Sequence, residues 1–503
     1  MIIVYTVIVI ILFVLFYKIK NKRAHELLKQ FPCYPTYPLI GNAYMLHRLN
    51  DGLLLSLERL LAPYDRLLFW LGPVPALILK KYDDIMTVLN QTQDRDTMNL
   101  LEEWIGVGIL NAKFDDWKKS RKMLSPAFSS EMLVRYADVF HEKASILVDE
   151  LKGPADRGEI VNAWDYVMNT NLETVLANTL GTSIEKTGKD AKNYCSVLHK
   201  TFQNLTTRVI SPWLHPGFIY KIYLKLIGQM NTIKILNDLP EEDLSLIRIF
   251  QAIEEKLNNV RNTKKAQEYV DDSPNSIIDL LIEKSAKETS FTKTRIRDEA
   301  VQLILVGSET TALNVCFTLL ALAIHQDIQQ KVYEEIVQVM PEKDTLDTDD
   351  CINQLKYLEQ CVKETSRIYS QSVLVIRRTH KDCTLKDNKI IPKNTLVAAA
   401  IHFSHFDPEL YKNPSVYDPE HFNDEAVAKR PKGSELVFGY GPRICIGAKY
   451  SIISSKMQLA HIIRNYHLST NIKEITKNDL NADLCLRSKI GYPIKFTSRQ
   501  KAK

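Results

Sequence analysis

A chain of 503 residues, 45% hydrophobic and 25% charged, has the composition of a globular protein with a large core. Its 65 Lys and Arg against 60 Asp and Glu leave a formal net charge of +5, which excludes the strongly basic surface of a nucleic-acid-binding protein and suits at most weak contact with an anionic membrane or an acidic partner. The eight cysteines contain no C-x-x-C pair, which argues against a zinc ribbon or a thioredoxin-like site. Their scatter over so long a chain argues against a disulfide scaffold and for a reduced, cytosol-facing body.

The N-terminal segment is the first predicted element. Ile2 to Tyr17 carries no charged side chain, and with Met1 it makes 17 residues, the lower end of a membrane-spanning helix. Lysine and arginine follow the apolar run, and no small-residue cleavage site is present, so an unusual cleaved signal is the less favoured alternative. We expect a membrane anchor over residues 1–19, with the rest of the chain in the cytosol.

Residues 20–45 read as a basic, proline-rich hinge, because Pro32, Pro35 and Pro38 favour a stiff, non-helical spacer. From residue 46 to 503 no further linker, repeat or low-complexity tract interrupts the chain, which indicates one large domain. The apolar spacing predicts helices at 131–151, 243–262, 294–324, 327–340 and 353–370. Short strands are predicted at 66–71, 75–80, 373–378, 395–401 and 492–497, so the fold class is mainly α with small β-sheets.

The predicted helix 294–324 is apolar on nearly all sides and should run through the core. "GSETT" interrupts its middle, where a glycine costs about 1 kcal/mol and a buried glutamate costs several unless it is paired. Polar groups in such a place usually mark a site. The alternative is a tight helix crossing at Gly307, with Glu309 bonded to a neighbour.

The stretch "FGYGPRICIGA" crowds three glycines and a proline around Cys445, just before a predicted helix. A helix N-terminus and turn amides favour an anionic sulfur, which suits a single axial metal ligand, and Arg443 could bind an anionic group of a cofactor. The alternative is a small, buried core cysteine.

The spacing Phe438-x-x-Gly441-x-Arg443-x-Cys445-x-Gly447 resembles the haem-binding signature of the cytochrome P-450 superfamily. Further segments resemble that family in its own order along the chain: "DDWKKSRKMLSPAF" with Trp117 and Arg121, "VGSETTA" with Glu309 and Thr310, "ETSR" with Glu364 and Arg367, Arg377, and the meander "FDPELYKNPSVYDPEHF".

The resemblance implies haem b held by the Cys445 thiolate, with O2 as co-substrate. It assigns Glu309 and Thr310 to catalysis as a proton-delivering acid–alcohol pair. It assigns six residues to haem binding: Trp117, Arg121, Arg377, Phe438, Arg443 and Gly447. The tryptophan and the three arginines would bind the haem carboxylates. Glu364, Arg367 and His421 are the implied structural network, and Val306 and Val373 are pocket residues.

The sequences of two motifs, "DDWKKSRKMLSPAF" and "GPRICIGAKYS", are similar to those of the fatty-acid ω-hydroxylase branch, family 4. Other positions depart from the pattern of that branch. Val306 stands where that branch usually has a glutamate that can esterify the haem, so we expect non-covalent haem. Ser370 and Val373 replace the usual prolines. His421 replaces the usual meander arginine and, near its reference pKa of about 6.5, is expected to be mostly neutral.

The resemblance implies a microsomal monooxygenase that inserts one oxygen atom into a small apolar substrate such as a fatty acid, steroid, terpenoid or xenobiotic. Electrons would come from NADPH–cytochrome P-450 reductase, with cytochrome b5 optional, at a face bearing Lys118, Lys119, Lys122 and Lys449. The expected location is the endoplasmic reticulum membrane. Two alternatives stay open: a haem-thiolate isomerase or dehydratase, and a non-catalytic haem protein that binds ligands. By analogy the pocket is lined by the central helix and by residues near 98–112, 200–230, 372–376 and 482–486.

Overall fold

The computed structural model describes residues 5, 19–37, 40–47, 52–95, 100–181, 203–227, 253, 254, 257, 276–285, 291–340 and 349–499. Of residues 46, 47, 103, 104, 212, 349 and 350 it describes the backbone alone. The expected membrane span, except Tyr5, and nearly all of the expected helix 243–262 lie outside the described residues.

Most of the described chain is helical. The helices are α2 (Lys22–Leu28), α3 (Tyr44–His47), α4 (Leu53–Leu61), α5 (Tyr82–Gln91), α6 (Glu102–Ile105), α7 (Phe114–Leu124), α8 (Ser130–Asp156), α9 (Trp164–Leu180), α11 (Gly217–Leu226), α13 (Ile277–Ser285), α14 (Lys293–Ile324), α15 (Gln326–Val339), α16 (Asp349–Gln354), α17 (Lys356–Ile368), α18 (Ile401–Ser404), α19 (Asp424–Lys429) and α20 (Ala448–Asn465). Short 3-10 helices lie at η2 (Ser125–Phe128), η4 (Pro212–Leu214), η8 (Pro419–Phe422) and η9 (Lys477–Asp479).

The strands are short. They are β1 (Arg66–Leu71), β2 (Val74–Leu79), β3 (Ile160–Asn162), β4 (Val375–Arg378), β5 (Cys383–Thr384), β6 (Ile390–Ile391), β7 (Leu396–Ala399), β8 (Tyr466–Ser469), β9 (Leu480–Ala482), β10 (Leu486–Ser488) and β11 (Pro493–Ser498). The largest described sheet has the order β1-β2-β7-β4, in which β2 and β7 are parallel and the other neighbours antiparallel. A second sheet has the order β3-β11-β8, and β9–β10 and β5–β6 form two-stranded pairs.

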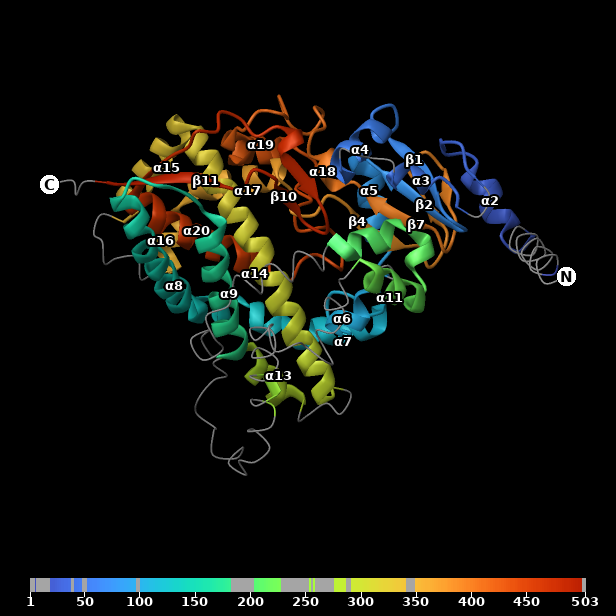
Figure 1. Cartoon of the computed structure of the whole chain (residues 1–503), viewed down its shortest axis with the longest axis horizontal. Coiled ribbons are helices and arrows are strands. Elements are labelled where there is room, and N and C mark those ends of the chain that lie inside the picture. The colour runs from blue at the N-terminus through green and yellow to red at the C-terminus, as the bar shows by residue number, and fades with distance from the viewer. Residues whose placement is uncertain are drawn as a thin grey trace.

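The long helix α14 organises the molecule. It runs obliquely between the sheet with α4 and α5 on one side and the helices α8, α9, α15, α17 and α20 on the other (Figure 1). Within the described residues α14 alone is long and apolar enough to cross a membrane, but 78% of its apolar stretch is buried inside the molecule. A helix that is apolar all round belongs in a core, so α14 forms the central wall against which the other helices pack.

The N-terminal segment is more firmly attached than a hinge. Cys33 and Gly41 form bridges to β1, and the N–H of Leu68 donates to the carbonyl of Pro32 at 2.8 Å. Leu28 and Phe31 are buried among residues of β1 and β2. The expected spacer is non-helical around Pro32 and Pro35, while Pro38 lies outside the described residues. The segment also contains α2 and bridges to β1, and its apolar side chains supply part of the core of that sheet.

Candidate active site

The loop before α20 has the sharply turned backbone that its glycines predict. Gly439 and Gly441 have φ angles of 75° and 74°, and a Cβ on Gly441 would lie 2.7 Å from the carbonyl oxygen of Leu89. The N–H of Cys445 closes the loop by donating to the carbonyl of Phe438 at 2.9 Å. Because α20 begins at Ala448, the cysteine lies immediately before a helix N-terminus, as expected.

Cys445 opens into a cavity of about 270 Å³, measured as the space open to the centre of a water-sized sphere. The cavity brings together most of the residues that the sequence motifs indicate. Those that line it are Trp117, Arg121, Val306, Thr310, Arg377, Phe438, Arg443, Cys445 and Gly447. They come from α7, α14, β4 and the loop before α20, four segments far apart in the sequence.

The sulfur of Cys445 experiences opposing influences. Burial raises the pKa of the thiol, while the backbone N–H of Gly447 and the charges of Arg95 and Arg121 lower it without reversing the shift. The expected stabilisation of an anionic sulfur by a turn amide is thus present at Gly447, but burial outweighs it. A metal ion bound to a thiol displaces its proton, so a metal bound here would produce the thiolate.

Four arginines surround the same cavity: Arg95, Arg121, Arg377 and Arg443. In the described part of the chain they donate to backbone carbonyls, such as those of Ile444 and Ala112, and form no ion pair with a carboxylate. Burial lowers the pKa of all four, to about 10 for Arg95 and about 9 for Arg443. The cost of burying these cations would be offset by an anionic ligand.

Hydrogen-bond donors of the buried arginines that have no partner among the described residues also point to an anionic ligand in the cavity. The Nε atoms of Arg95, Arg377 and Arg443, and Nη1 of Arg443, are buried and have no partner in the described part of the chain. The guanidinium of Arg443 lies 4.4 Å from the ring centroid of Trp117, which fixes its plane at the cavity wall. The two carboxylates of a haem would satisfy such donors, so the residues present fit this cofactor. Sequence reasoning missed Arg95, since a single arginine between two aspartates in "QDRDT" resembles an ordinary surface charge.

The middle of α14 supplies one wall of the cavity through Val306, Gly307, Thr310 and Thr311. The Thr310 hydroxyl donates to the carbonyl of Val306 at 2.8 Å, and the Thr311 hydroxyl lies 3.1 Å from that of Ser451 on α20. Asn314, one turn further on, lines the cavity with a buried Oδ1 atom that lacks a partner in the described chain. Its type and position in an apolar run were the signal that sequence reasoning passed over.

Glu309 departs from its predicted place. Its carboxylate does not line the cavity but pairs with Arg487 of β10, and burial raises its pKa to about 7 against the charge of Arg487. Gly307 lies against Val175 of α9, where an added Cβ would make an ordinary 3.6 Å contact. The structural alternative, a buried glutamate bonded to a neighbour, therefore holds for Glu309, while Thr310 faces the cavity.

The sequence profile of the cytochrome P450 family matches residues 32–496, which is most of the chain. The chain belongs to the cytochrome P450 superfamily. Its curated relatives include cytochrome P450 4c21 of Blattella germanica, which is 27% identical over 478 residues and 94% of each chain. Cytochrome P450 4V2 of Homo sapiens is 26% identical over 92% of this chain and 88% of its own. Cytochrome P450 4g15 of Drosophila melanogaster is 24% identical over 97% and 96%.

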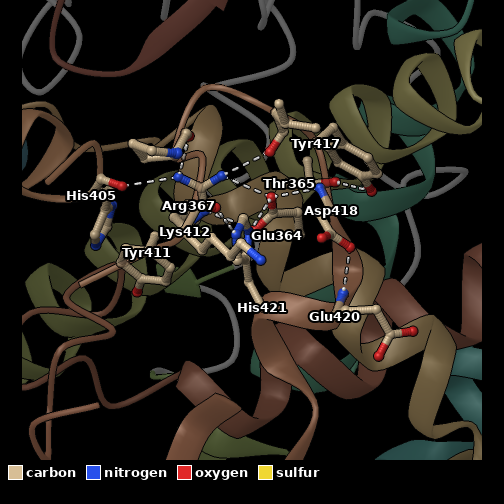
Figure 2. Close-up of polar contacts among 12 residues, drawn as sticks. Glu364, Thr365, Arg367, His405, Tyr411, Lys412, Tyr417, Asp418, Glu420 and His421 are labelled. Atoms are coloured by element: carbon tan, nitrogen blue, oxygen red, sulfur yellow. Dashed lines mark hydrogen bonds and ion pairs between the residues drawn. The ribbon is translucent and has the colours of Figure 1, made fainter. Parts of the chain in front are cut away.

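This cytochrome P450 therefore carries haem iron with thiolate ligation and is in general a haem-thiolate monooxygenase, similar to family 4. Its E-x-x-R pair, Glu364 and Arg367, forms a buried network (Figure 2). Arg367 donates two parallel bonds of 2.7 Å to Glu364 and further bonds to the carbonyls of His405 and Pro414. The bond from Arg367 to Pro414 and the bond from the N–H of Asp418 to Glu364 tie α17 to the meander, which leads into the haem-binding loop.

His421 replaces the usual meander arginine and still joins this network. Its Nδ1 lies 3.1 Å from Glu364 Oε1 and its Nε2 lies 2.6 Å from the carbonyl oxygen of Lys412 (Figure 2). Burial lowers the pKa of His421, but the bond to Glu364 and its charge outweigh burial and raise the pKa overall. The environment therefore favours the charged form of His421 more than the reference pKa suggests, because both ring nitrogens face acceptors and only the imidazolium can donate to both.

The cavity lining also corrects the pocket regions expected from analogy. Val373 is buried but does not line the cavity, whereas its neighbours Ser372 and Val375 do. Ile109 and Leu110 represent the region 98–112. The described residues near 200–230 and 482–486 do not line the cavity. The expectation failed there because the composition of those segments does not reveal how they pack.

Proposed function

We propose that this cytochrome P450 is a membrane-anchored monooxygenase that inserts one oxygen atom from O2 into a small apolar substrate, with electrons from NADPH–cytochrome P-450 reductase. The observation that carries the proposal is that Cys445, Thr310 and four arginines converge on one cavity, and that these arginines pair with no carboxylate among the described residues. Thiolate-ligated haem iron supplies the activation of O2 and favours O–O cleavage. The chain's own residues then have to hold the cofactor, exclude water and deliver protons.

Cys445 is the proposed axial ligand, and Arg95, Arg121, Arg377 and Arg443 are the proposed partners of the two haem carboxylates. Thr310 is the proposed group that holds a proton donor, because its oxygen accepts bonds from water while its own hydrogen stays on the Val306 carbonyl. Glu309 would reach this relay only by leaving Arg487. Ile109, Leu110, Leu303 and Val306 make the wall apolar, which suits an apolar substrate.

The electron-donor proposal rests on exposed lysines close to the cofactor-binding elements. Lys118, Lys119 and Lys122 are exposed on α7, the helix whose other side places Trp117 and Arg121 at the cavity. Lys449 is exposed in the first turn of α20, four residues after Cys445. A basic face here would attract an acidic reductase or cytochrome b5.

Attachment to the endoplasmic reticulum membrane is proposed from the apolar N-terminal run and from α11. Phe218, Ile222 and Leu226, spaced four residues apart on α11, are exposed by 70%, 56% and 81%, and Lys221 and Lys225 flank them. An apolar helix stripe bordered by lysines suits the surface of an anionic bilayer.

The test uses the full chain in lipid nanodiscs. We expect the wild type and Cys33→Ser, which changes an exposed cysteine away from the cavity, to give the ferrous–CO spectrum of thiolate-ligated haem. Cys445→Ser should abolish it, and a thiolate-type spectrum in that variant would overturn the proposal. Oxygen consumption coupled to product in the presence of reductase separates a monooxygenase from an isomerase, a dehydratase or a ligand-binding protein.

A further inference from the structure

A short loop between α6 and α7 lies along the N-terminal half of α14, where three side chains accept its backbone N–H groups. Val107 donates to Asp298 at 2.9 Å, Ile109 to Glu299 at 2.7 Å and Leu110 to Gln302 at 2.8 Å. The three acceptors lie within five consecutive residues of α14. We call Asp298, Glu299 and Gln302 the clamp residues, and residues 106–112 the wall loop.

The same loop offers its carbonyls to the arginines of the cavity. The Leu110 carbonyl accepts from Arg95 at 3.2 Å and the Ala112 carbonyl from Arg443 at 2.8 Å. The side chains of Ile109 and Leu110 line the cavity. The wall loop is therefore bonded to α14 through its N–H groups and to the proposed haem-carboxylate site through its carbonyls.

The two glycines of "GVG" have a reason in this contact. Gly106 has a φ angle of 65°, and a Cβ there would lie 2.2 Å from the Asp298 carboxyl carbon. A Cβ on Gly108 would lie 2.6 Å from the Gln302 side chain. Only glycine at both positions lets the loop backbone approach the clamp residues this closely.

The clamp residues are buried, with exposed fractions of 7% for Asp298, 0% for Glu299 and 1% for Gln302. Glu299 also accepts from Arg295 at 3.0 Å, and Arg295 donates to Ser120 on α7 at 2.5 Å. Buried acceptors lose their partners if the loop lifts away, which is costly, so the bonded arrangement is strongly favoured.

We propose that the clamp residues hold the wall loop as a fixed wall of the cavity, and that Gln302 is a positioning residue that sets which ligands fit. Gln302 is the clamp residue that also lines the cavity, and its Nε2 donates to Asn111 Oδ1 at 2.9 Å, which locks the loop from inside. The claim that the wall loop selects ligands rests on the proposed function. The claim that the clamp residues hold the loop rigid does not.

The first test measures amide hydrogen exchange of the haem-loaded full chain in nanodiscs. Gln302→Met keeps the side-chain length but removes the donor and the acceptor, and we expect exchange of residues 105–112 to rise about 10-fold, since these amides would open locally. Thr318→Val is the control, because Thr318 is buried on α14 but bonds only the carbonyl of Asn314. Unchanged exchange in Gln302→Met would overturn the clamp.

The second test uses imidazole and 4-phenylimidazole as iron ligands of different size, followed by their absorption spectra. If Gln302→Met releases the wall loop, the ratio of the Kd values for imidazole and 4-phenylimidazole should change at least 5-fold in this variant. The ratio should be unchanged in Thr318→Val. An unchanged ratio with raised exchange would overturn the positioning role of Gln302. Loss of the thiolate CO spectrum in the wild type would instead contradict the proposed function, and the exchange result would still decide the clamp.

Gly108→Ala gives an independent variant in case Gln302→Met fails to fold. The three atoms nearest to the added methyl group all belong to the Gln302 side chain, so Gln302→Ala should make room for it. We expect Gly108→Ala alone to raise exchange of the wall loop, and the double variant to exchange no faster than Gln302→Ala. Additive effects would overturn the proposed contact.

Discussion

Val306 and Thr310 lie one helical turn apart on α14, and both face the cavity. The Thr310 hydroxyl donates to the carbonyl of Val306, so the bulk of one residue and the polarity of the other share a single site. Both residues can be changed without touching the Cys445 loop, which makes their roles separable.

Thr310→Ala should leave haem and ligand binding intact and divert reducing equivalents to hydrogen peroxide. Alanine is a good helix former, so the helix is kept, while the hydroxyl and the γ-methyl group of Thr310 are lost and the proposed proton relay is broken. Positioned proton transfer contributes about 10²–10⁴-fold, so product per NADPH should fall by at least about 10-fold. Peroxide and product are measured together, and Thr310→Ser should restore coupling. Unchanged coupling in Thr310→Ala would show that another group, such as Asn314, holds the proton donor.

The haem should be extracted completely by acidified organic solvent. Valine at position 306 has no oxygen that could form an ester, and the nearby Glu309 carboxylate pairs with Arg487 rather than facing the cavity. Only the sulfur–iron bond, carboxylate contacts and packing then retain the cofactor. Haem absorbance is compared between the solvent and the denatured polypeptide, and haem remaining on the polypeptide would contradict this expectation.

Between elements, the contact of α17 with η8 depends on a titrating group. Glu364 accepts from Arg367, from His421 and from the N–H of Asp418 at 2.8 Å, so its carboxylate is fully used. Arg430 donates to the carbonyl of His421 at 2.5 Å and stacks on Tyr411. Loss of the His421 charge would leave one ring nitrogen facing an oxygen without a proton.

Haem retention on heating should therefore fall as the pH rises above about 6.5, the reference pKa of histidine. Since the pKa of His421 is raised in the folded protein, its stabilisation is complete below the unfolded value and is lost as the pH passes the folded value. His421→Arg keeps its charge and should remove this part of the pH dependence, and His467→Gln, an exposed change in β8, is the control. Parallel pH profiles for the wild type and His421→Arg would contradict the prediction.

The spacing of apolar residues predicted the long helices well, because each of them buries either one face or nearly its whole surface. Helix 294–324 was found as Lys293–Ile324, and the hairpin around Gly72 as β1 and β2. Apolar spacing did not single out α9, because part of its buried face is polar: Asn171 bonds Gln458, and Asn178 bonds Tyr450. Strands such as β5 and β6, two residues each, are too short to show a period.

The candidate site was predictable where one motif determines position and less so where distant segments meet. The cavity is lined, as the sequence motifs predict, by Cys445, Thr310, Arg121, Arg377 and Arg443. The role of Arg95, the partner of Glu309 and the raised pKa of His421 depend on tertiary contacts between residues 57 to 348 positions apart in the chain, and no local pattern encodes those.

On the scale of the whole molecule, the N-terminal segment belongs partly to the body. Beyond the bridges to β1, His25 stacks on Trp70 with ring centroids 4.7 Å apart, and Gln30 donates to the carbonyl of Ile390 at 2.8 Å. Asn42 accepts from the N–H of Trp70 at 2.7 Å. Residues of α2 and of the segment after it are therefore packed as part of the folded body, which does not start near residue 46.

Two deletions distinguish these boundaries. Removing residues 1–20 should give a haem-binding protein that is less firmly bound to membranes, since it deletes the apolar run and leaves α2 in place. Removing residues 1–43 also deletes Leu28 and Phe31, exposed by only 0% and 3%, whose burial contributes about 1.5–3 kcal/mol each. That loss is a large part of the roughly 5–15 kcal/mol that stabilises a typical domain, so the longer deletion should lose haem at a clearly lower temperature. Membrane sedimentation and thermal release of haem measure the two effects. Equal thermal stability of both deletions would return residues 20–45 to the role of a simple hinge, and failure of the shorter one to bind haem would show that the apolar run itself supports the fold.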